Sequence, residues 1–245
     1  MAVSILFAGI SKGGFGSGAA FVAVPILTAI MGPKAAIGLM LPLLMLMDIT
    51  GLYFYWGRWY KKGALILILG GIPGVLLGAL FFSVANQYFL KGLIGIIAIC
   101  YVFKQLALKN RGVSMNEKLA SNLSGYILAI ISGFTSCISH AGGPPAAIYL
   151  LSKNISKTEF QATTILIFWL INIFKLFPFI YFGFVSRDTL TFSFWLVPIA
   201  FLGTWIGVKL HFIISEKLFY FFINWLLFVT GAKLIYDAYF GLFAF

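Results

Sequence analysis

The sequence has very little charge for its length. Only 9% of its 245 residues are Asp, Glu, Lys or Arg, and just 6 of them are acidic, whereas a soluble domain has about 25% charged residues. In contrast, 62% of the residues are hydrophobic and 27 are Phe. A soluble core of this length could not bury so much apolar surface, so the sequence predicts an all-α protein that is embedded in a lipid bilayer.

Cysteine and histidine are also scarce, with two residues of each. Cys100 and Cys137 both lie in apolar runs, so the sequence predicts no disulfide framework. Cys137 and His140 have a C-x-x-H spacing, but no further Cys or acidic cluster joins them, and two ligands are too few for a metal site. We therefore expect neither a bound metal nor a cofactor.

Motifs for catalysis and for nucleotide binding are missing as well. The sequence has no P-loop and no nucleophile–base–acid arrangement, so we expect that the chain is not an enzyme and does not by itself use ATP to drive transport. The net charge of +11 falls mostly on loops and helix ends, so we expect no nucleic-acid partner. No basic region precedes the first apolar run, so no cleavable signal peptide is expected.

What the sequence does contain is a series of apolar segments joined by short polar stretches. About 20 apolar residues suffice to cross a bilayer core of about 30 Å. The segments cover residues 1–31, 35–56, 63–84, 88–107, 121–152, 159–184, 189–213 and 217–240. The longest polar stretch divides the chain into a first transmembrane repeat (1–107), an inter-repeat loop (108–120) and a second transmembrane repeat (121–245).

The two halves match each other at offsets of 123 to 125 residues. The matched pairs are Gly9 with Gly133, Lys34 with Lys157, Asp48 with Asn172, Pro73 with Pro198 and Gly78 with Gly203. We therefore predict two homologous repeats that pack on each other, since neither could satisfy its freed backbone groups alone.

Each repeat begins with an apolar segment that a glycine-rich break interrupts. The breaks cover residues 9–18 and 133–145, and a broken helix in each repeat is typical of a transporter's substrate site. The half-helix after each break would direct its N-terminus, with free N–H groups and roughly half a positive charge, toward the membrane centre. Such a cavity would favour an anion. The alternative is that the glycines only permit close helix packing.

The positions of the 17 Lys and Arg residues bear on whether segments 1–31 and 121–152 cross the membrane. If all eight segments span, nine basic residues gather on one side and six on the other. If these two segments are re-entrant hairpins, the split is eleven against four. Basic residues favour the cytoplasmic side, so we prefer hairpins over continuous spans, with both termini outside. Each repeat then has three full spans, and the second repeat is inverted relative to the first.

Four ionisable side chains lie inside the predicted membrane segments, where charges are costly and usually functional. Lys12 and His140 lie in the two breaks, and Asp48 and Lys175 lie in the segments that follow. An ion pair of Asp48 with either lysine would offset the cost of burial, and Asp48 and His140 are the candidates for proton coupling. The residues that we predict to bind substrate are Lys12, Gly13, Gly14, Gly16, Gly18, His140, Gly142, Gly143, Pro144, Asn172 and Lys175.

Aromatic residues cluster beside basic ones at the end of the second segment. The run from Tyr53 to Tyr60 includes Arg58 and is followed by Lys61 and Lys62. It is typical of an interfacial belt with cytoplasmic anchors. We also expect His211, which lies near a segment end, to be interfacial.

At these residues the chain resembles the sulfite exporter TauE/SafE family of membrane permeases. The resemblance covers nearly the whole chain in order, while Cys137 and His140 depart from a pattern of small residues. The resemblance is carried by residues 9–18 followed by Pro25, residues 33–38, Leu41, Pro42 and Asp48, and then by residues 142–145, 149–151, 159–163, Phe168, Asn172 and Lys175. It implies a permease that exports sulfite or a small organosulfur anion.

We therefore expect a multi-pass secondary transporter of the cell inner membrane that exports a small anion by alternating access. The membrane potential alone could drive this export, and whether protons are coupled stays open, as do the substrate and the oligomeric state. The main alternative is a membrane-embedded assembly or metal-handling factor. An intramembrane enzyme or a channel fits the residues less well.

Overall fold

The structure, a computed structural model, describes residues 1–16, 23–31, 33–80 and 121–243, and between the last two ranges residues 88–89, 92, 95–96, 98–100 and 102–103. Within these ranges the regular secondary structure is all α-helix, as predicted. The helices are α1 (Ala2–Gly14), α2 (Ala23–Met31), α3 (Pro33–Tyr55), α4 (Lys61–Leu80), α6 (Asn122–Ser139), α7 (Gly143–Leu151), α8 (Lys157–Tyr181), α9 (Arg187–Ile213) and α10 (Glu216–Phe243).

Five of these helices are long and apolar enough to cross a membrane, namely α3, α4, α8, α9 and α10. This finding confirms the prediction of a multi-pass helical membrane protein. The predicted segment 1–31 holds two helices, α1 and α2, and the segment 121–152 holds α6 and α7. The inter-repeat loop, most of segment 88–107 and the candidate Gly18 lie outside the described residues.

Glycine contacts show how α1 and α6 are packed. α1 runs parallel to α9, because Gly9 lies against Gly203 and Gly14 lies against Gly207 further along both helices. A Cβ atom on Gly13 would overlap with the backbone carbonyl of Thr204, so the two backbones approach each other as closely as helices can. A helix from the first half of the chain therefore lies against one from the second half.

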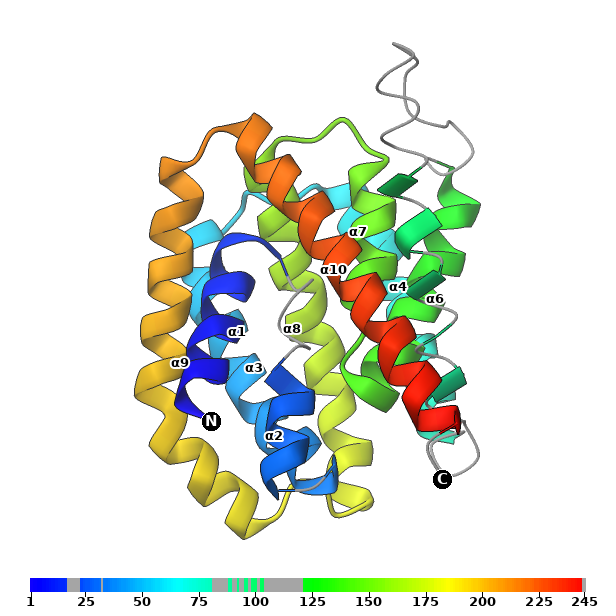
Figure 1. Cartoon of the computed structure of the whole chain (residues 1–245). Helices are drawn as coiled ribbons and strands as arrows, with labels where there is room; N and C mark the ends of the chain where they lie inside the picture. The colour runs from blue at the N-terminus through cyan, green and yellow to red at the C-terminus, as the bar shows by residue number, and fades with distance from the viewer. Residues whose placement is uncertain are drawn as a thin grey trace.

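The complementary pair is α6 and α4. Gly70 of α4 lies against Ala129 and Gly78 lies against Cys137, so these two helices also run parallel. A Cβ atom on Gly133 would overlap with the carbonyl oxygen of Gly71. The two halves of the chain thus interlock, with α3 and α8 packed against each other between these pairs (Figure 1).

Polar contacts fix which helix ends lie together. The N–H of Tyr60, just before α4, donates to Thr163 near the start of α8 at 2.8 Å. The ammonium of Lys157, at the start of α8, donates to the carbonyl of His211 near the end of α9 at 2.8 Å. The start of α4 and the end of α9 therefore lie at the same end of the molecule. Since α4 and α9 run in opposite directions, so do their partners α6 and α1.

The same end of the molecule carries most of the described cations. Lys153, in the loop before α8, has its pKa lowered by burial and by the nearby charge of Lys62, so this loop lies close to the start of α4. The cations in or beside these helix ends are Arg58, Lys61, Lys62, Lys153, Lys157, Lys209 and Lys217.

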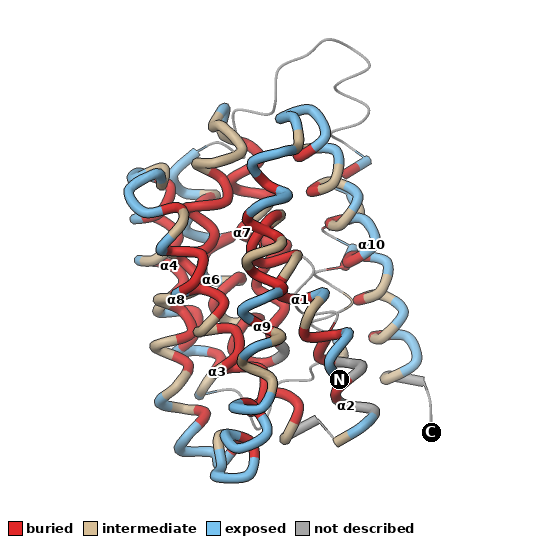
Figure 2. Tube along the Cα trace, turned by 90° about the vertical axis from the view of Figure 1, so that its left-hand side faces the viewer, coloured by how far each residue is buried: buried red, intermediate tan, exposed pale blue. Residues whose placement is uncertain are grey.

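The remaining surface is strongly apolar and suits a lipid environment. Large side chains such as Phe194 and Trp195 on α9 are 72% and 73% exposed, and α10 exposes much of its length (Figure 2). By contrast, α3 and α7 are mostly buried. The core that α9 and α10 cover is where the candidate residues lie.

Candidate functional site

A buried ion pair joins the end of α1, in the first break, to α3. The Nζ atom of Lys12 on α1 lies 3.0 Å from Oδ1 of Asp48 on α3, and the side chains are 2% and 0% exposed. The other carboxylate oxygen of Asp48 accepts a hydrogen bond from Nδ2 of Asn172 on α8 at 2.9 Å. The sequence allowed Asp48 to pair with either lysine, and the structure pairs it with Lys12.

Lys175 has quite different partners. Its Nζ atom lies 2.8 Å from Nδ1 of His140, 3.2 Å from Oγ of Ser136 and 3.4 Å from Oδ1 of Asn172. The side chain is fully buried, and no carboxylate of the described residues lies within ion-pair distance of it. An ammonium has three donors and no acceptor, so a protonated Lys175 donates to three neutral groups.

The contacts of His140 define its role in this network. Its Nε2 atom lies 3.2 Å from the carbonyl oxygen of Ile37, which can only accept, so Nε2 carries the proton. Nδ1 is then free to accept from Lys175 in the neutral imidazole. His140 thus links α6 to α3 and holds the ammonium of Lys175 between two helices.

The chain around His140 is shaped by local hydrogen bonds. His140 has a left-handed φ of 55° and ends α6, with its N–H donating to Ser136 O and the N–H of Ala141 donating to Thr135 O. The hydroxyl of Ser132 donates to the carbonyl of Gly142 at 2.7 Å. This arrangement is a typical helix C-terminus, which satisfies its last carbonyl groups with nearby donors.

The end of α1 in the first break is capped differently, by side chains from three other helices. Gln161 of α8 donates to Lys12 O at 2.7 Å, and Tyr55 of α3 donates to Gly13 O at 2.8 Å. Nδ1 of His211 on α9 lies 3.1 Å from Gly14 O. Because a carbonyl accepts, His211 donates there, and the last carbonyls of α1 are satisfied.

Two of these three residues correct the sequence interpretation. Tyr55 and His211 were expected at the membrane interface, but they are 1% and 0% exposed. Their neighbours Tyr53 and Trp56 do lie at the surface, at 81% and 71% exposed. Aromatic and histidine residues near a basic loop are typical of an interface, but the end of α1 buries these two.

Helical spacing could have identified two of the capping residues. Tyr55 follows Asp48 by seven residues and Gln161 precedes Lys175 by fourteen, so each lies on the same helix face as a candidate site residue. His211 has no such relation to a candidate residue, and its role follows only from the packing of α9 on α1.

The glycines and proline of the two breaks have several different environments. Gly13 and Gly14 pack on the backbone of α9, and Gly142 packs on Ser132 and Ser136 of α6. Pro144 lies in the buried first turn of α7 together with Pro145. Proline has no N–H, so the start of α7 offers fewer free donors than the sequence interpretation assumed.

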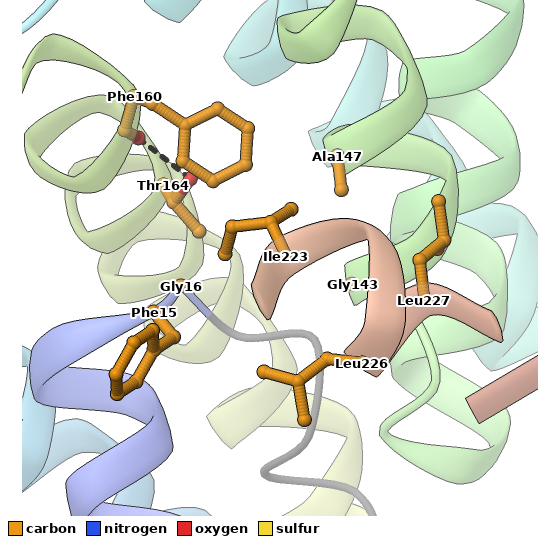
Figure 3. A pocket seen from close by; sticks show the side chains of 9 residues that line it. All are labelled: Phe15, Gly16, Gly143, Ala147, Phe160, Thr164, Ile223, Leu226 and Leu227. Atoms are coloured by element: carbon orange, nitrogen blue, oxygen red, sulfur yellow. Dashed lines mark hydrogen bonds between the residues drawn. The ribbon is translucent and has the colours of Figure 1, made fainter. Parts of the chain in front are cut away.

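An apolar pocket lies beside this network, between the end of α1 and the start of α7 (Figure 3). Gly16 and Gly143 line it from the two breaks, and α10 contributes to its wall. Its full lining is Phe15, Gly16, Gly143, Ala147, Phe160, Thr164, Ile223, Leu226 and Leu227. No charged side chain lines the pocket, so it is distinct from the polar network of Lys12, Asp48 and Lys175.

Metal ligands do not gather in the described part of the chain. Three or more His, Cys, Asp or Glu residues placed to hold one ion do not occur among the residues that the structure describes. Cys137 is a buried free thiol that packs against Gly78.

Comparison with known proteins identifies one family. A family model described as "TauE: Sulfite exporter TauE/SafE" matches residues 1–234. No match was found among curated proteins or among solved structures. The matched range includes every residue of the polar network and both breaks.

Proposed function

Since the chain belongs to the sulfite exporter TauE/SafE family, it is a multi-pass membrane transporter, and we propose that it exports sulfite or a small organosulfur anion at a site centred on Lys175. One observation carries this assignment of the site. Lys175 is a fully buried ammonium whose described partners are all neutral. A buried charge without a counterion is costly, and a bound anion would supply the counterion.

The neighbours of Lys175 suit an oxyanion with several acceptor atoms. Ser136 and Asn172 carry donors that could turn toward an anion beside the ammonium. Gly142 and Gly143 closely follow His140 in the sequence. His140 positions Lys175 and is a candidate for proton exchange. Lys12 is neutralised by Asp48, so it contributes its charge only when that pair opens, which makes the pair a candidate coupling element.

The burial of the site and the directions of the helices support alternating access. Lys175 is 0% exposed, so an anion can reach it only after a movement opens the site to one side. α1 and α6 run in opposite directions and lie against helices of the opposite half. These relations support two inverted repeats, 1–107 and 121–245, with re-entrant breaks, one of which rocks against the other.

The cluster of cations at one end of the molecule supports an orientation. Seven described Lys and Arg residues lie at the end where α4 starts and α9 ends, and such residues favour the cytoplasmic side. Export of an anion from that side is aided by a negative-inside potential, by about 2.3 kcal/mol per charge at 100 mV. The bilayer is then the inner membrane of the cell.

The test is flux from proteoliposomes loaded with sulfite at a fixed membrane potential, with sulfate, thiosulfate and acetate as competitors. We expect saturable sulfite efflux that Lys175→Met abolishes. The matched control is Lys233→Met, which removes a lysine that is paired with Asp237 on α10 and is 30% exposed. Unchanged flux in Lys175→Met would contradict the assignment of the site. No flux of any anion from folded wild-type protein would contradict the proposed anion export and favour an assembly or metal-handling factor.

A further inference from the structure

The end of α1 is held by an unusual set of contacts. The last four carbonyl groups of any helix have no partner within it, and inside a membrane each unsatisfied group is costly. In α1 the N–H of Phe15 satisfies Ser11 O. The next three carbonyls, those of Lys12, Gly13 and Gly14, accept from Gln161, Tyr55 and His211. One donor comes from each of α8, α3 and α9.

These contacts bear directly on the charge balance of the site. The first of the three carbonyls belongs to Lys12, whose ammonium pairs with Asp48. Asp48 also accepts from Asn172, which lies within 3.4 Å of Lys175 through its other amide atom. A single amide group, that of Asn172, therefore separates the carboxylate of Asp48 from the second lysine, Lys175.

We propose that Tyr55, Gln161 and His211 are positioning residues that hold the end of α1. They keep Lys12 paired with Asp48, so that Lys175 remains able to bind the anion. This inference rests on the proposed function and adds how the anion site is kept available. When a capping donor is lost, the last turn of α1 loosens and Lys12 withdraws from Asp48. The carboxylate then turns toward Lys175 and competes with the anion.

A competing carboxylate has a specific kinetic effect. It competes with the anion for Lys175 and is displaced when the anion saturates the site, so KM rises while kcat is nearly unchanged. A cap that only stabilised the fold would instead lower the amount of active protein and leave KM as it was. The ratio of the two effects therefore separates positioning from stability.

The primary test is Tyr55→Phe, which removes only the hydroxyl that donates to Gly13 O. We expect KM for sulfite to rise about fivefold, as for the loss of one buried hydrogen bond, with kcat within about twofold of wild type. Tyr53→Phe is the matched control, because Tyr53 lies on the same helix but is 81% exposed. Equal KM values for Tyr55→Phe and wild type would overturn the proposal.

A change of background tests the route through Asp48. The double variant Lys12→Met with Asp48→Asn retains Lys175 and removes the carboxylate that would compete with the anion. In that background we expect Tyr55→Phe to leave the Kd for sulfite, measured by calorimetric titration, unchanged, whereas Tyr55→Phe alone raises it about fivefold. An equal rise of Kd in both backgrounds would overturn the proposal, because the effect could then not act through Asp48.

His211 provides a rescue experiment and a second route if Tyr55→Phe folds poorly. In His211→Asn the amide nitrogen can take the place of Nδ1 and donate to Gly14 O, whereas His211→Leu has no donor. We expect KM near wild type for the first and raised about fivefold for the second. A wild-type protein that moves no anion would refute the proposed function, whereas flux with the same KM in both His211 variants would refute only the positioning role.

Discussion

The two helix ends that meet the breaks are capped in contrasting ways. At the end of α6, the carbonyls of Ser136 and Thr135 accept from the N–H groups of His140 and Ala141, four and six residues further along the chain. The hydroxyl of Ser132, in α6 itself, donates to the carbonyl of Gly142 in the break. At the end of α1, the caps come from three other helices. The second break can therefore form as soon as α6 forms, whereas the first depends on the assembled bundle. The side-chain donors that cap the end of α1 all lie far from it in the sequence.

The charges of the two halves differ in a related way. Asp48 of the first half corresponds to Asn172 of the second, and Lys175 corresponds to Gly51. The first half thus holds a cation that its own carboxylate neutralises, and the second half holds a cation with neutral partners. In the function that we propose, the anion is held by the residues of the second half.

Making the second half resemble the first should have the largest effect on transport. Asn172→Asp places a carboxylate beside Lys175, which would then be neutralised without an anion. We expect sulfite flux to fall at least about 100-fold, or about 2.7 kcal/mol, measured in proteoliposomes. Asn154→Asp, in the exposed loop before α8, is the control. Wild-type flux in Asn172→Asp would show that Lys175 does not need to be unpaired.

Breaking the ion pair of the first half should reduce stability strongly. Asp48→Asn alone leaves Lys12 buried without a counterion, and we expect a loss of about 3–5 kcal/mol in the free energy of unfolding. Lys12→Met alone leaves Asp48 in the same position. The double variant should recover most of the loss, because neither charge is left alone. Additive losses in thermal unfolding of the detergent-solubilised protein would argue against a coupled pair.

Small residues where α1 crosses α9 and α6 crosses α4 should be of intermediate importance. Gly13→Ala and Gly133→Ala each place a methyl group against a backbone carbonyl, and we expect each to cost about 1–3 kcal/mol of unfolding free energy. Gly51→Ala is a control, since the atoms nearest to its Cβ would belong to the side chain of Ile165 and not to a backbone. If all three variants unfold alike, close packing at the two crossings is not required.

The local caps of the second break should matter least. Ser132→Ala leaves the carbonyl of Gly142 without its hydroxyl donor, and we expect a loss of about 1 kcal/mol of unfolding free energy. The KM for sulfite should stay at the wild-type value, in contrast to Tyr55→Phe at the first break. A KM that rises as much as in Tyr55→Phe would remove the distinction between the two ends.

Much of the fold was predictable from the sequence because lipid imposes simple rules on segment length and composition. The bounds of α3, α4, α8 and α9 lie within a few residues of the predicted segments. The unusual ionisable residues were also recognisable, because a charge in an apolar run is rare. Lys12, Asp48, His140 and Lys175 do lie in one connected network.

The connections within the network were not predictable. Spacing along a helix tells which residues share a face but not which helix lies opposite, so the choice of Lys12 over Lys175 as the partner of Asp48 stayed open. The burial of Tyr55 and His211 was missed for the same reason. Each is next to residues typical of an interface, and only the approach of α1 gives each a carbonyl to cap.

The central claim is that Lys175, and not Lys12, carries the charge that binds the anion. Its most direct test is calorimetric titration of sulfite into the purified protein, comparing Lys175→Met with the double variant Lys12→Met and Asp48→Asn. We predict saturable binding to wild type and to the double variant, with no binding to Lys175→Met. Binding that survives in Lys175→Met and disappears in the double variant would contradict the account and move the anion site to the first break.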